Sequence, residues 1–147
     1  MKYSTAKLGK IYIIRLEDGE IIHDEIEKFA KEKGIKAGSI QVVGGIDKGS
    51  ILIVGPKESR GEKIEPMEHI LDDAHEVTGT GTIFPDSRGN PILHLHISCG
   101  RKTNTITGCV RKGVKVWHVL EIIIQEFKNN TAKRLLDNNT GFELLKP

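Results

Sequence analysis

The sequence has few of the features that mark secreted or membrane proteins. It contains only two cysteines, Cys99 and Cys109, which cannot form a disulfide framework, so thiols or metal ligands are their expected roles. Its longest apolar run, Val119–Ile124, is interrupted by Glu121, and none approaches the roughly 20 residues of a membrane helix. No apolar signal-like stretch follows the first five residues. We therefore expect a cytoplasmic protein with no membrane partner.

The composition is that of an ordinary globular protein. Hydrophobic residues make up 37% of the chain and charged residues 29%, a balance that argues against disorder. A length of 147 residues suits one hydrophobic core and leaves little for a second. We therefore expect a single domain over residues 1–147.

Strong charge of one sign is also missing. The net charge is +2 and the pI is near 8.5, whereas a dedicated nucleic-acid domain more often has a pI above about 9. One compact basic cluster stands out, made by Arg111, Lys112 and Lys115. Composition is therefore neutral on DNA binding.

Side-chain periodicity predicts more strands than helices. Apolar residues at helical spacing predict one main helix over residues 21–33, ended by Gly34. Alternating or β-branched runs predict strands at 9–16, 39–46, 50–54, 76–84, 91–99, 104–110, 114–127 and 141–145. The remaining long segment, 56–73, should be a loop with a short helix near 67–71.

The connections between these strands predict the fold class. We expect one hairpin to join 39–46 to 50–54 and a second to join 91–99 to 104–110. Most connections are too short for parallel crossovers. The prediction is therefore an α+β fold, a mostly antiparallel sheet with the 21–33 helix packed on it.

His94 and His96 are the sharpest chemical signal in the sequence. Side chains two apart on a strand point to the same face, so the two imidazoles should stand side by side, as a Zn²⁺ site requires. A third ligand could be Cys109, if strand pairing places it opposite His96. A register shifted by one residue would place it opposite Leu95 instead, and the sequence leaves both registers open. The alternative interpretation is a pair of hydrogen-bonded histidines at a subunit interface.

Five segments occur in an order and spacing typical of a known family. They are residues 19–30, 74–81, 91–98, 108–113 and 140–145. The third reads Pro-Ile-Leu-His-Leu-His-Ile-Ser, and the fourth matches Gly-His-Leu-x-x-Gly with Cys109 in place of His. Together they make most of the chain resemble the PPC domain, conserved in plants and prokaryotes, in its stand-alone prokaryotic form.

The resemblance implies an antiparallel sheet flanked by helices, a homotrimer and contact with DNA. Because Cys109 occupies the position of a family histidine, the resemblance also favours the register that places the thiol on the histidine face. Basic side chains repeated in a trimer could contact phosphates together. The candidates for that contact are Arg101, Lys102, Arg111, Lys112 and Lys115.

We rank first a homotrimeric PPC-type binding protein whose His-rich site holds a metal ion, with DNA contact as an open part of the hypothesis. The second hypothesis is a metal- or small-molecule-binding protein or an uncharacterised metalloenzyme. The third is a scaffold for a partner protein. We favour binding over catalysis, because nothing near Cys99 marks an oxyanion donor or an orienting carboxylate.

Overall fold

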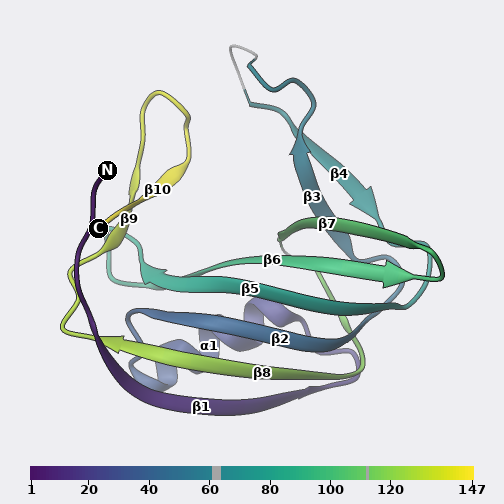
Figure 1. The fold of residues 1–147 in the computed structure, drawn as a ribbon, viewed down its shortest axis with the longest axis horizontal. Helices are drawn as coiled ribbons and strands as arrows, with labels where there is room; N and C mark the ends of the chain where they lie inside the picture. Colours follow the sequence, from purple (N-terminus) through teal and green to yellow (C-terminus); the bar gives the residue numbers. More distant parts are fainter. Residues whose placement is uncertain (61–63, 112) are drawn as a thin grey trace.

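The computed structural model describes residues 1–60, 64–111 and 113–147, and it confirms the α+β prediction (Figure 1). The one helix of this part is α1 (Ile22–Lys33). The strands are β1 (Lys7–Glu17), β2 (Gly38–Ile46), β3 (Ile51–Pro56), β4 (Pro66–Ile70), β5 (His75–Pro85), β6 (Pro91–Arg101), β7 (Asn104–Val110), β8 (Val116–Lys128), β9 (Lys133–Leu136) and β10 (Glu143–Lys146). Within the described residues, no helix is long and apolar enough to cross a bilayer.

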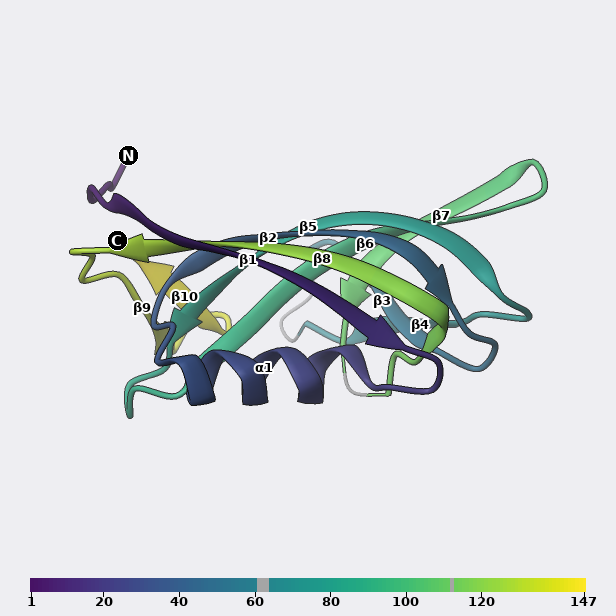
Figure 2. The ribbon, with the colours of Figure 1, turned by 90° about the horizontal axis from the view of Figure 1, so that it is seen from below.

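Eight of these strands form one antiparallel sheet in the order β1-β8-β2-β5-β6-β7-β3-β4, and β9 pairs separately with β10. Figure 2 shows α1 lying along one face of this sheet. We call the face toward α1 the inner face and the opposite one the outer face. The core lies between α1 and the inner face, and its largest buried members come from β2, β5, β6, β8 and the helix.

The helix forms where the sequence predicts it and ends for the predicted reason. Ile22, Ile26 and Ala30 are buried on its inward side, at the spacing of successive turns. Gly34 takes a left-handed conformation with φ of 68°, and its N–H donates to the carbonyl oxygen of Lys31. The helix therefore covers the part of the inner face that lies along its length.

The predicted first hairpin is wrong. β2 pairs with β5 and β8, whereas β3 lies near the other edge of the sheet between β7 and β4. The turn at 47–49 leads the chain away from β2 and does not join neighbouring strands. Both edges of β2 are occupied by strands distant in sequence, which pair its backbone N–H and C=O groups on both sides.

The predicted short helix near 67–71 is also wrong, because this segment contains the edge strand β4. It pairs with β3 alone, for example Ile70 with Ile51, and all five of its residues are exposed. An exposed edge strand lacks the alternation of a half-buried one, so its sequence carries little strand signal. The predicted strand at 141–145 corresponds to β10, but its partner β9 was not predicted.

Two glycines let β5 approach β6 closely beneath the histidines. A Cβ atom on Gly81 would lie 2.3 Å from the carbonyl oxygen of His94, and one on Gly79 would lie 2.5 Å from that of His96. Side chains at these positions would push the strands apart. The Thr-Gly alternation of β5 therefore positions the segment that carries the histidines.

Candidate metal site

His94 and His96 lie side by side on the outer face of β6. Both side chains are exposed, while Leu93, Leu95 and Ile97 between and beside them are buried on the inner face. The Nε2 atoms of the two rings are 3.1 Å apart, and the rings meet edge to face. Strand alternation thus gives the predicted arrangement of the imidazoles.

Cys109 joins them from the neighbouring strand. The β6–β7 pairing places Cys109 opposite His96, which is the register that the family resemblance favoured. The two imidazole nitrogens and the thiol sulfur all lie within 4.8 Å of one another. The structure therefore brings together the three side chains that the sequence analysis proposed as ligands.

This donor set fits a tetrahedral metal ion. With Zn–N bonds of about 2.05 Å, two nitrogens of a tetrahedral site are about 3.3 Å apart, close to the separation of the two Nε2 atoms. Two imidazoles and one thiolate supply three ligands and leave one position open. A zinc ion would need only small side-chain adjustments to be held here.

The electrostatics of the site favour the ligand form of His94 but not that of Cys109. Partial burial lowers the pKa of His94, and the nearby charges of Arg134, His96 and Arg111 lower this pKa further, so its imidazole stays neutral. Burial raises the pKa of the Cys109 thiol, while the guanidinium groups of Arg111 and Arg134 oppose that rise. Metal binding would therefore have to displace the thiol proton.

Arg134 on β9 is a site residue that the sequence analysis missed. Its Nη2 donates to the hydroxyl of Thr82 at 3.1 Å, and Thr82 pairs directly with His94 across the β5–β6 ladder. The residue is only 8% exposed, and its Nε has no hydrogen-bond partner among the described residues. No local motif marked it, because β9 has neither alternation nor β-branched residues.

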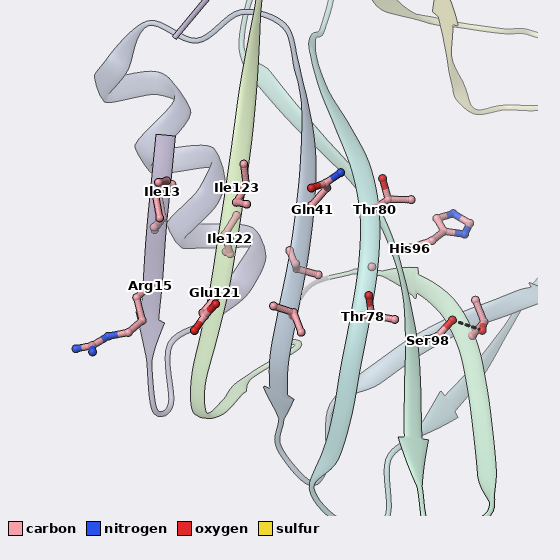
Figure 3. A pocket seen from close by; sticks show the side chains of 15 residues that line it. Ile13, Arg15, Gln41, Thr78, Thr80, His96, Ser98, Glu121, Ile122 and Ile123 are labelled. Atoms are coloured by element: carbon pink, nitrogen blue, oxygen red, sulfur yellow. Dashed lines mark hydrogen bonds between the residues drawn. The ribbon is translucent and has the colours of Figure 1, made fainter. Parts of the chain in front are cut away.

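The outer face continues from the histidines toward β1 as a row of directly paired residues. Crossing from β6, the register joins His96 to Thr80, Thr80 to Gln41, and then Gln41 to Ile123 and Ile123 to Ile13. Figure 3 shows these side chains standing on adjacent strands. They line a pocket of about 940 Å³. The face thus passes from apolar through hydroxyl-bearing to imidazole side chains.

Glu121, the acid that interrupts the apolar run of β8, lies on this face near its apolar end. It is exposed and stands opposite Arg15 of β1 and Val43 of β2. The Arg15 side chain binds Glu17 instead.

Among the described residues, the proposed DNA-contacting side chains do not form one cluster. Arg101 binds Asp73 and the carbonyl oxygen of Ala74, and Lys102 follows it at the β6–β7 turn. Arg111 is exposed at the other end of β7, and Lys115 binds Asp47 through a 2.8 Å ion pair. Lys112 lies outside the described residues. Two of these positive charges are thus compensated by carboxylates within the chain.

The second cysteine has a different environment. Cys99 is fully buried on the inner face, and burial raises its pKa to about 12. Such a thiol is an unreactive core residue. His75 is also buried, and its Nδ1 lies 2.8 Å from the carbonyl oxygen of Asp73.

The chain is similar over most of its length to one known family. The sequence model of the Plants and Prokaryotes Conserved (PCC, also written PPC) domain matches residues 3–128. The structure resembles a metal-containing protein of Archaeoglobus fulgidus, with a TM-score of 0.86 at 22% identity over 100% of both chains. It also resembles a plant- and prokaryote-conserved protein of Pyrococcus horikoshii, with a TM-score of 0.83 at 24% identity over 100% of this chain and 98% of that one.

The chain is also similar to two further proteins. A protein of Bacteroides thetaiotaomicron, provisionally named as DNA-binding, has a TM-score of 0.74 at 22% identity over 97% of this chain and 98% of that one. The bifunctional protein GlmU of a Synechococcus strain is 24% identical over 136 residues, which is 90% of this chain. The chain spans only 19% of the length of that relative. The solved structures show a shared fold.

Proposed function

The chain belongs to the Plants and Prokaryotes Conserved domain family, and from this premise we propose that it is a homotrimeric binding protein that holds a zinc ion on His94, His96 and Cys109. One observation carries the metal part of this proposal. The three potential ligand atoms come from two strands and lie within 4.8 Å of one another. The metal-containing name of the similar Archaeoglobus fulgidus protein supports the same interpretation.

Ligand chemistry favours zinc over the harder divalent ions. Magnesium and calcium prefer oxygen ligands, whereas imidazole and thiolate together suit Zn²⁺. Because three protein ligands leave a coordination position open, the ion can take a further ligand from solution. The proposed activity is therefore binding at a metal centre, and we assign no reaction to it.

Metal analysis of protein purified without a histidine tag tests this proposal. We expect about one zinc per chain in the native protein and almost none in the double variant His94→Ala/His96→Ala. The matched control is His69→Ala, which removes an exposed imidazole from β4. Zinc missing from the native protein, or retained by the double variant, would refute the metal site.

The apolar end of the outer face supports the trimer. Large apolar side chains that the core does not use are exposed there on β1, β2 and β8, and Ile13 is 86% exposed. They include Ile11, Ile13, Val43, Val119 and Ile123. Such a patch on a monomer is typical of a subunit interface. We propose that copies of this chain cover it.

Light scattering coupled to gel filtration tests the assembly. A trimer would have three times the chain mass of 16.3 kDa. Ile13→Glu should dissociate it, because a carboxylate buried in an apolar interface without a partner is costly. Ile70→Glu, the same change at an exposed residue of β4, should leave the mass unchanged. A native mass of one chain would contradict the trimer.

DNA binding is a second candidate, supported by the provisional names of two structural neighbours. Arg111 and Lys102 are exposed basic residues that a trimer would present three times. Affinity should fall steeply as salt rises, and Arg111→Gln combined with Lys102→Gln should flatten that dependence. If duplex DNA fails to bind even at low salt, this part of the proposal is wrong while the metal site stands.

A further inference from the structure

Arg134 is a buried cation that lacks a complete set of partners. Its Nη2 donates to the Thr82 hydroxyl, its Nε has no partner, and no carboxylate among the described residues forms an ion pair with it. A buried charged donor without an acceptor is costly to the folded state. A guanidinium held in this way is typical of a site that receives an anion from outside the chain.

The arginine faces the proposed metal ligands. Thr82, which anchors it, is the direct cross-strand neighbour of His94 on the outer face. Its charge acts on both His94 and Cys109, and the exposed Arg111 acts on the same two side chains. Two guanidinium groups therefore flank the His94–His96–Cys109 cluster from different elements.

Within the described residues, no carboxylate takes the place of that anion. Glu143 on β10 is near enough to affect the charge of Arg134, but it is exposed and makes no hydrogen bond to it. The β9–β10 pairing places the apolar Leu145, not Glu143, opposite Arg134. Burial lowers the pKa of Arg134, as expected for a cation whose surroundings do not compensate its charge.

We propose that the metal site binds a small oxyanion, a carboxylate or phosphate group, which completes the coordination of the metal and accepts hydrogen bonds from the Arg134 guanidinium. This inference rests on the proposed metal site and names the class of ligand that its open position takes. The planar guanidinium can donate hydrogen bonds to two oxygens of such a group, and the positive charge of the exposed Arg111 adds electrostatic attraction.

Cobalt provides a direct readout, because Co²⁺ replaces zinc and its visible absorption reports changes in coordination. The native protein, purified without a tag and loaded with Co²⁺, is titrated with acetate and separately with inorganic phosphate. We expect a saturable spectral change with at least one of them, at concentrations where chloride has no effect. The anion that binds more tightly identifies the preferred group.

Arg134→Gln is the decisive variant. We expect it to weaken anion binding by about 10- to 100-fold, the loss of a charge-assisted hydrogen-bonded contact. Its affinity for Co²⁺ should be equal or higher, because a positive charge beside the ion is removed. If Arg134 had a merely structural role, its substitution would lower both the affinity for the anion and the affinity for Co²⁺. Arg88→Gln, at an exposed arginine of the β5–β6 turn, is the matched control and should match the native protein.

The outcomes separate this inference from the proposal on which it rests. Failure of the native protein to take up Co²⁺ removes the metal site and the anion site together. Uptake of Co²⁺ without any anion-dependent spectral change, or with the same change in Arg134→Gln, overturns the anion site alone. Should Arg134→Gln not fold, Thr82→Val removes the anchoring hydroxyl at nearly constant volume. This substitution should lower the affinity for the anion several-fold, and an unchanged affinity would contradict the proposal.

Discussion

The two faces of the eight-stranded sheet are built from the same strands but have different chemistry. On β6, Leu95 and Ile97 are buried against the core, while His94 and His96, which alternate with them, project outward. On β8, Leu120 and Ile122 face inward, and Glu121 and Ile123 face outward. The inner face under α1 is mainly apolar. The outer face changes across the strands from apolar through threonine to histidine and cysteine.

This difference shows which face stability constrains and which face is available for binding. Inner residues must fill the space beneath the helix, so they are mainly apolar. Outer residues contribute little to the core, so their side chains can vary in chemistry and are available for binding. The predictions below compare matched positions on the two faces.

The largest expected contrast lies between two adjacent isoleucines of β8. Ile122 is 1% exposed and Ile123 is 40% exposed. Ile122→Ala should lower the free energy of unfolding by about 2–5 kcal/mol, because it leaves a cavity in the core. Ile123→Ala should cost under about 1 kcal/mol in the monomer and instead weaken assembly. Denaturant unfolding at several protein concentrations measures both the stability of the monomer and its assembly. Equal losses of unfolding free energy in the two variants would contradict the different roles of the two faces.

The next contrast concerns the glycines that let β5 approach β6. Gly81→Ala should cost about 1–3 kcal/mol, because the added methyl group meets the His94 carbonyl oxygen. It should also weaken zinc binding, since it displaces a ligand strand. Gly100→Ala is the control, because its Cβ would meet only ordinary contacts, the nearest at 3.7 Å. An undisturbed zinc site in Gly81→Ala would show that this packing does not position the histidines.

The metal site should depend on pH through Cys109 rather than His94. The pKa of Cys109 lies above its ordinary value of 9.0, so the thiol is protonated at neutral pH and zinc must displace one proton. Zinc affinity should therefore rise about tenfold per pH unit from about pH 7 to about pH 9. His94 adds no slope there, since its lowered pKa keeps it neutral. In Cys109→Ala the slope should vanish, and a native affinity independent of pH would exclude the thiolate ligand.

The two cysteines give the smallest contrast, one on each face. Cys99→Ala should lower the free energy of unfolding by about 1 kcal/mol, because it removes a buried sulfur, and should leave the zinc content unchanged. Cys109→Ala also removes a buried sulfur and should lower the free energy of unfolding by a similar amount, but it should lower zinc affinity as well. Calorimetry and metal analysis of the two variants measure this, and loss of zinc in Cys99→Ala would contradict the assignment.

Local patterns in the sequence predicted much of the fold and part of the site. The helix spacing, the alternation around His94 and His96, and the β6–β7 hairpin each depend on neighbouring residues, and each is confirmed. The register of that hairpin could not be predicted from the residues. Its ladder continues to Arg101 and Asn104, and Lys102 of the tight turn adopts a φ of 55° that glycine or asparagine usually supplies.

Partners that are distant in sequence account for the rest. The pairing of Ile40 with Ile124 decides where β2 lies, and no turn signal indicates it. Arg134 reaches the site through Thr82, across 52 residues of sequence, from a strand without a recognisable pattern. Strand order and long-range side-chain contacts depend on the packing of the whole sheet, which local periodicity does not encode.

The most direct test of this account is an anomalous diffraction measurement at the zinc absorption edge on crystals of the untagged protein. The account predicts one strong peak per chain, bonded to Nε2 of His94 and His96 at about 2.0–2.1 Å and to the Cys109 sulfur at about 2.3 Å. Crystals that contain zinc elsewhere, or no anomalous peak on the outer face between β6 and β7, would contradict it.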